Sequence, residues 1–151
     1  MRFSIAAALA LTAAPSLSAQ AIPDLSAVAP LGGSWSWTQT TDGSEATFTD
    51  AYSRPQLIIH CTRASRRLTI SKPATVAAPS LDIWTSSQSR SLPATFSATD
   101  ARLSASLPAF DSLLDAMTTS RGRVGVTVSG SAPLVVPPWA EIGRVVEDCR
   151  V

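Results

Sequence analysis

The chain has 151 residues, of which 45% are hydrophobic and 15% charged, and its formal net charge at pH 7 is +1. A charge this close to zero gives no overall attraction to nucleic acid or to an anionic membrane, so proteins that bind these by bulk electrostatics are excluded. The length suits one domain with a single hydrophobic core.

Residues 1–21 have the pattern of a secretory signal peptide. Arg2 precedes an uncharged run from Phe3 to Ala14, and small residues follow up to Ala21. The run is shorter than the roughly 20 apolar residues that a membrane-spanning helix needs. We therefore expect cleavage after Ala21 and a periplasmic or secreted mature protein with no membrane span.

The segment after the cleavage position is expected to be a leader. Residues 22–32 contain two prolines and show no clear hydrophobic period, which is typical of a loosely docked segment. Residues 33–151 then predict a single β-rich domain. Their short alternating segments and turn residues favour a mainly β (α+β) fold, a small antiparallel β-sandwich or partly open barrel of about seven to nine short strands.

The first two predicted hairpins place large apolar residues on one face. A turn at Asp42-Gly43 joins the first pair of strands, and alternation puts Trp35 and Trp37 on the same side. In the second hairpin, Cys61 shares the core-facing side of its strand with two aliphatic residues, and His60 points away from it. The strands expected in these hairpins and after them are residues 35–40, 45–50, two arms within 55–72, 80–87, 91–98, 102–108, 123–130 and 134–136.

A short helix is predicted before the penultimate strand. Asp111 can cap its N-terminus, Leu113, Leu114 and Met117 lie on one side, and Gly122 can end it.

The chain is expected to finish in a second helix. Pro138 suits its first turn. Trp139, Ile142, Val146 and Cys149 recur at steps of three, four and three and predict one buried face. On the solvated side, Arg144 can pair with Asp148.

The two cysteines of the chain, Cys61 and Cys149, are expected to form a disulfide. An exported protein folds in an oxidising compartment, where disulfides persist. The bond would fasten the far end of the terminal helix to the strand that carries Cys61. This gives the terminal cysteine a structural reason for its position.

The sequence disfavours catalytic and metal chemistry. His60, the only histidine, points away from Cys61 on a strand, so the two cannot act as a nucleophile pair. One histidine and two distant cysteines have no metal-ligand spacing, and we expect no metal and no cofactor. Asp82, Asp111 and Asp115 could serve a small carboxylate-dependent hydrolase, but helix capping and the helix dipole explain the last two more simply.

The candidate binding residues are basic and aromatic. Residues 62–72 hold Arg63, Arg66, Arg67 and Lys72 without any acidic residue. They could bind an anionic envelope component or an acidic protein, although a solvated turn is the simpler interpretation. Trp84 is the best single contact candidate if it is exposed.

The order of elements in FDSLLDAMTTSRGRVGVTVSGSAPLVVPPWAEIGRVVEDCR, residues 110–150, resembles the C-terminal part of the invasion-associated locus B family of exported Gram-negative proteins. A similar layout occurs in periplasmic accessory proteins associated with type VI secretion. The resemblance implies a β-sandwich-like exported module without enzyme activity, tied to the envelope or to host contact. Locus B proteins usually carry further cysteines in the middle of the chain, where this sequence has only Cys61, and no functional residue is carried over.

The function that we expect from the sequence is that of an exported, non-enzymatic binding or accessory module of the cell envelope. One alternative is an inhibitor of an envelope-degrading enzyme such as lysozyme. The other is the small hydrolase, which requires two of its candidate acids to converge in a cleft.

Overall fold

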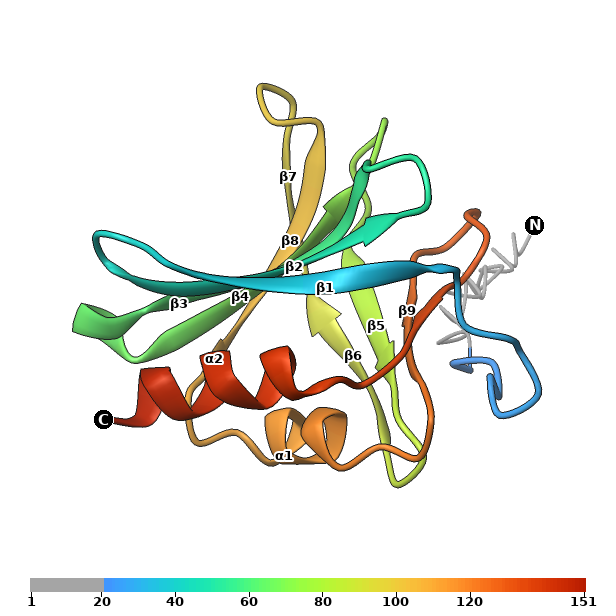
Figure 1. Cartoon of the computed structure of the whole chain (residues 1–151). Helices are drawn as coiled ribbons and strands as arrows, with labels where there is room; N and C mark the ends of the chain where they lie inside the picture. The colour runs from blue at the N-terminus through green and yellow to red at the C-terminus, as the bar shows by residue number, and fades with distance from the viewer. Residues whose placement is uncertain (1–20) are drawn as a thin grey trace, which may run out of the picture.

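A computed structural model describes residues 21–151 and places them in two antiparallel β-sheets and two α-helices (Figure 1). The predicted signal peptide, apart from Ala21, lies outside the described residues. The larger sheet has the spatial order β1 (Gly33–Gln39), β2 (Gly43–Asp50), β3 (Pro55–Thr62), β4 (Arg67–Pro73), β8 (Arg102–Pro108) and β7 (Thr95–Ser97). The smaller sheet has the order β10 (Leu134–Val136), β9 (Val124–Thr127), β5 (Ser80–Trp84) and β6 (Ser89–Pro93).

The predicted fold class is confirmed. The described chain is mainly β, helix α1 (Ser112–Thr118) precedes the penultimate strand β9, and helix α2 (Ala140–Arg150) ends the chain. Alternation in β3 buries Leu57, Ile59 and Cys61 completely. An antiparallel sheet with one solvated face requires this period of two, which is why the sequence pattern identified the strands.

The inner face of the larger sheet is covered by α2 and by the smaller sheet. Figure 1 shows α2 lying across β1 to β4, with α1 beside it. The buried side chains of α2 are Ile142, Val145, Val146 and Cys149, which join one continuous core with both sheets. None of the helices within residues 21–151 is long and apolar enough to cross a bilayer.

The predicted start of the terminal helix was wrong. Trp139 is 46% exposed and is not on the buried face of α2. It occupies the N-cap position with an extended backbone, φ −81° and ψ 171°, so its side chain leaves the helix surface before the first turn. Pro138 therefore precedes the helix, and Val145 completes the buried face in place of Trp139.

The predicted pair of Arg144 and Asp148 is replaced by contacts with Trp37. The guanidinium carbon of Arg144 lies 3.4 Å from the centre of the Trp37 ring. Asp148 accepts a hydrogen bond of 3.0 Å from Trp37 Nε1. Because strand β1 brings an indole between the two residues, its ring and its N–H satisfy both charges.

Residues 91–98, predicted as one strand, belong to two sheets. β6 pairs with β5 in the smaller sheet, whereas β7 pairs with β8 in the larger one. The change occurs at Ala94, whose backbone N–H still donates to the Pro79 carbonyl oxygen at 3.0 Å; Pro79 has no N–H to return the bond, so the ladder with β5 ends there. This split gives ten strands in the described chain where seven to nine were predicted.

Helix α1 has the predicted cap but not the predicted end. The Asp111 carboxylate accepts a 2.8 Å hydrogen bond from the backbone N–H of Leu113. The helix ends at Thr118 with Thr119 as its C-cap, and Gly122 lies beyond it in the loop with φ +75°.

The Cys61–Cys149 disulfide is present and joins α2 to the centre of the larger sheet. Both cysteines are fully buried, and their Cα atoms are 5.6 Å apart. Gly43, on the neighbouring strand, faces Cys61 so closely that a Cβ atom there would lie 2.0 Å from the Cys61 carbonyl oxygen. The neighbouring strand therefore packs closely on Cys61, whose sulfur atom forms the disulfide with Cys149 of α2.

Candidate functional site

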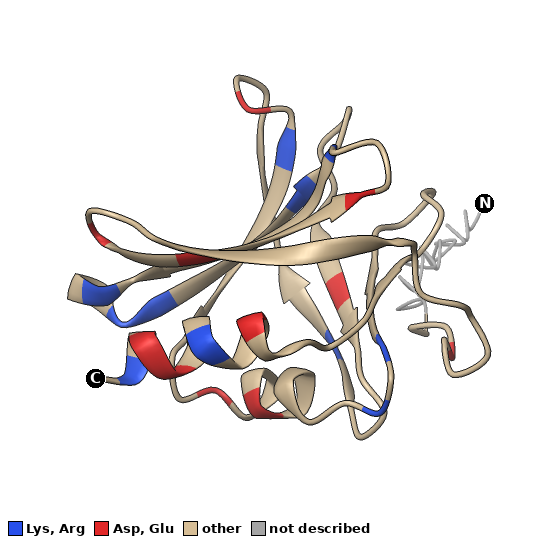
Figure 2. Cartoon of the chain, in the orientation of Figure 1, with Lys and Arg blue, Asp and Glu red and all other residues tan. Residues whose placement is uncertain are grey.

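Three of the four predicted basic residues lie together at the tip of the β3–β4 hairpin. We call Arg63, Arg66 and Arg67 the basic turn, and Figure 2 shows it near the C-terminal end of α2. The turn consists of a short 3-10 helix, Arg63–Ser65, closed by Arg66 in the left-handed conformation at φ 49°. This shape directs the basic side chains outward at one end of the molecule.

Two guanidinium groups of the basic turn have no bonded partner. Arg63 and Arg66 are exposed, and within residues 21–151 neither side chain forms a hydrogen bond or an ion pair. Arg67 donates from Nε to Ser106 Oγ at 3.0 Å and from Nη2 to the Ser106 carbonyl oxygen at 3.2 Å. Arg67 therefore anchors the strand, and the other two arginines are available to a ligand.

An exposed aromatic residue adjoins the basic turn. The backbone N–H of Ala109 donates to the Arg66 carbonyl oxygen at 2.9 Å, which places Phe110 beside the turn. Phe110 is 65% exposed, and the guanidinium carbon of Arg150 lies 5.6 Å from its ring centre. Sequence reasoning missed Phe110. Phe110 precedes Asp111, the N-cap of α1, and so does not belong to the apolar face of that helix. This position was the sign in the sequence that its ring could be exposed.

Lys72 was wrongly grouped with the basic turn. It lies near the other end of β4, five residues or about 17 Å of strand from Arg67, and is only 9% exposed. Its side chain points inward with Leu68 and Ile70, because residues two apart on a strand share a face. Burial lowers the pKa of Lys72 below its ordinary value of 10.5.

Replacing Lys72 by Met is expected to stabilise the fold by on the order of 1 kcal/mol at pH 7. Among the described residues no carboxylate pairs with its ammonium group, so folding partly desolvates this charge without an ion-pair partner. Because the pKa of Lys72 is lower in the folded state, its charged form destabilises the fold fully at pH values below that pKa. This destabilisation is relieved as the pH rises toward 10.5. Urea unfolding of both proteins at neutral and alkaline pH measures the difference, which should shrink at alkaline pH. A less stable Lys72→Met variant, or a constant difference, would contradict this account.

Trp84 is not the exposed contact residue that the sequence suggested. It is 9% exposed because Leu25 and Val135 pack against it. The predicted leader is thus docked, and Leu31 N–H donates to the Val135 carbonyl oxygen at 2.7 Å. Trp84 instead lines a pocket of about 470 Å³ between residues 24–26, the β5–β6 turn and the loop before β9.

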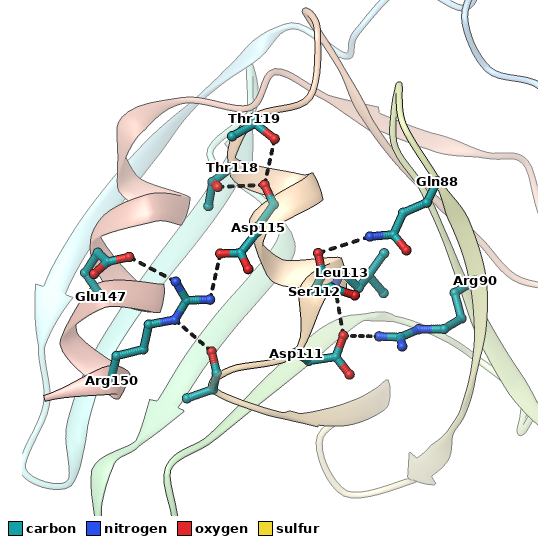
Figure 3. A network of polar contacts seen from close by, with 11 residues as sticks. Gln88, Arg90, Asp111, Ser112, Leu113, Asp115, Thr118, Thr119, Glu147 and Arg150 are labelled. Carbon is teal, nitrogen blue, oxygen red and sulfur yellow. Dashed lines mark hydrogen bonds and ion pairs between the residues drawn. The ribbon is translucent and has the colours of Figure 1, made fainter.

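The three candidate acids of a hydrolase are each held by a different partner. Asp111 pairs with Arg90, and Asp115 pairs with Arg150 at 2.7 Å. Figure 3 shows these two carboxylates pointing to opposite sides of α1. Asp82 accepts a hydrogen bond from Ser91. None of the three lines the pocket beside Trp84, so the arrangement gives the hydrolase hypothesis no support.

His60 takes part in an acidic cluster on the outer face of the larger sheet. Its Nε2 lies 3.2 Å from Asp42 Oδ2 and its Nδ1 lies 3.4 Å from Glu45 Oε2. Hydrogen bonds from Thr40 and His60 lower the pKa of Asp42. Cys61 points to the opposite face, as alternation predicts. Within residues 21–151, no group of three or more His, Cys, Asp or Glu residues is arranged to hold a metal ion.

Comparisons with known proteins give no family assignment. No family model, curated protein or solved structure matches the chain.

Proposed function

We propose that the chain is an exported, non-enzymatic binding module whose basic turn binds an anionic component of the cell envelope. The observation that carries the proposal is the pair of exposed guanidinium groups of Arg63 and Arg66, which have no acidic partner among the described residues and stand beside exposed Phe110. Guanidinium groups bind phosphate and carboxylate in a bidentate manner. An adjacent aromatic ring adds apolar contact area to such a site.

The setting of the basic turn supports the same proposal. The Cys61–Cys149 disulfide fixes the strand that leads into the turn, and Arg63 N–H donates to the Asp42 carbonyl oxygen at 2.9 Å, which ties the two neighbouring hairpin tips together. A preorganised turn loses less conformational entropy on binding than a mobile loop. The disulfide, the apolar start of the sequence and the resemblance to locus B proteins support export.

A double variant, Arg63→Gln with Arg66→Asn, tests the proposal. Asparagine tolerates the left-handed conformation of residue 66, so the turn should keep its shape while it loses two charges. Each arginine near an anionic surface contributes about 1 kcal/mol, so binding should weaken roughly thirtyfold. The probes are vesicles with and without phosphatidylglycerol and a soluble sulfated polysaccharide, measured by co-sedimentation and titration at two salt concentrations.

The matched control is Arg144→Gln, which removes one positive charge from α2 outside the basic turn. It should bind as the unmodified protein does, and Arg63→Gln alone should already weaken binding. Equal binding by the double variant, or equal loss in the control, would reject the basic turn as the binding site. Preference for vesicles or for the polysaccharide would identify the class of envelope component.

A further inference from the structure

The pocket beside Trp84 is a concave site that the proposed function does not use. It lies far along the chain from the basic turn, and its lining comes from Asp24, Ser26, residues 84–89, Arg121 and Arg123. Its volume of about 470 Å³ falls within the roughly 300–1,000 Å³ of small-molecule sites. The lining is mostly hydroxyl and charged groups, with the Trp84 indole as its large apolar member.

Two walls of the pocket are fastened to each other by hydrogen bonds. In the β5–β6 turn, Ser86 N–H donates to Ser120 Oγ at 3.0 Å, and Ser86 Oγ accepts from Arg121 N–H at 2.9 Å. Ser120 Oγ in turn donates to the Arg123 carbonyl oxygen. The turn and the loop before β9 are therefore held in one arrangement, which gives a site that is formed before any ligand arrives.

The third wall is the docked N-terminal segment. Leu25 is 2% exposed and packs on Trp84, and a Cβ atom at Gly125 would lie 2.2 Å from the Leu25 Cδ1 atom, so the glycine makes room for this contact. Arg123 Nη1 donates to the Ser26 carbonyl oxygen. Hydrogen bonds from the backbone and the side chain of Ser26 lower the pKa of Asp24, so its carboxylate stays ionised at the rim.

Several polar groups of the pocket are left without partners. Within residues 21–151, no hydrogen bond or ion pair engages the Arg121 guanidinium, the Trp84 indole N–H or the Ser89 hydroxyl. Trp84 is nine-tenths buried as a residue, but its indole N–H keeps contact with solvent and is therefore available as a donor to a ligand. The pocket is thus an open depression that presents a cation, two neutral donors and a carboxylate.

We propose that this pocket binds a sugar acid, a single hydroxylated ring that carries a carboxylate. Arg121 would hold the carboxylate in a bidentate pair. The Ser89 hydroxyl and the Trp84 N–H would bond ring hydroxyls, and the ionised Asp24 would accept from hydroxyls at the rim. The indole gives the ring an apolar surface to lie against. The site uses none of the basic-turn residues, so this proposal does not depend on the proposed function and can be tested separately from it.

Titration with galacturonate, followed by NMR of the backbone amides of residues 84–89 and 121–123, tests the inference. Galactose, which has the ring hydroxyls without the carboxylate, and acetate, which has the carboxylate without the ring, are the matched probes. We expect saturable shifts with galacturonate and at least tenfold weaker binding by the other two. Arg121→Gln, which leaves every bond between the walls in place, should weaken galacturonate binding at least tenfold, whereas Arg144→Gln should not change it.

An oligogalacturonide distinguishes the sources of the sugar acid. Tighter binding than that of the monomer would identify the end of an acidic polysaccharide, and equal binding would identify the free sugar acid. The inference is overturned if galacturonate gives no saturable shifts in these segments, if acetate binds as tightly as galacturonate, or if Arg121→Gln binds unchanged. Failure of the basic-turn experiment leaves these readouts unaffected, because they involve different residues and probes.

Discussion

Breaking the Cys61–Cys149 disulfide is expected to lower the free energy of unfolding by about 4–5 kcal/mol. The bond joins residues separated by 88 positions, and the chain-entropy model assigns a loop of that size a stabilisation of this order. Since single domains are stable by only about 5–15 kcal/mol, much of the native stability depends on this link. Urea unfolding of the oxidised protein and of the Cys61→Ala, Cys149→Ala double variant measures the difference.

The intact mass of the protein purified from its source, alkylated with and without reductant, accompanies that measurement. A chain that begins at Ile22 and has no free thiol before reduction is the expected result. Two alkylatable thiols without reductant, or equal stability of the double variant, would contradict the role of the bond. Hydrogen exchange should locate the loss in α2, because the remaining links to the sheet that we describe are its buried side chains and its contacts with Trp37.

The Phe48→Ala substitution is expected to cost about 3–5 kcal/mol. Phe48 is fully buried on β2, and its ring makes an edge-type contact with the Trp35 ring, with 5.5 Å between ring centres. Removing the ring leaves a cavity in the shared core that the surrounding side chains can close only in part. Thermal or urea unfolding checks the loss.

Phe110→Ala is the matched control for Phe48→Ala. The same side-chain atoms are removed from a residue that is largely exposed, so the change in stability should stay within about 0.5 kcal/mol. Similar losses for both variants would mean that Phe48 does not occupy the core position described. The control has a second use, because it should weaken binding at the basic turn while the fold stays intact.

Local sequence patterns were sufficient to predict most of the elements. Period-two alternation located the strands that carry Cys61, Leu68 and Leu103, since each has one buried and one solvated face. Asp111 and the apolar residues after it predicted α1, because capping is a short-range interaction within the same few residues. The split at Ala94 was missed, because the residues before and after it both read as strand and only the sheet to which each belongs differs.

The candidate site was predictable only in part. Arg63, Arg66 and Arg67 are close in sequence and stay close in space, but Lys72 belongs to the same basic run and is buried at the far end of its strand. A count of charges along the chain does not show which face of the strand each residue occupies. That follows only when the alternation of the strand is used to assign every position to one face.

By itself, the sequence determined the two-faced strands, the capped helix, the pairing of the two cysteines and the absence of a global charge. The strands and the helix depend on interactions between near neighbours, the disulfide on there being only two thiols to pair, and the charge on composition alone. The tertiary structure decided that Trp84 is covered by Leu25, that Trp37 lies between Arg144 and Asp148, and that Arg121 stands over a pocket. These contacts join segments that are from 37 to about 110 positions apart in the chain. Their geometry is set by the packing of the two sheets and α2 around one core, which no local sequence pattern encodes.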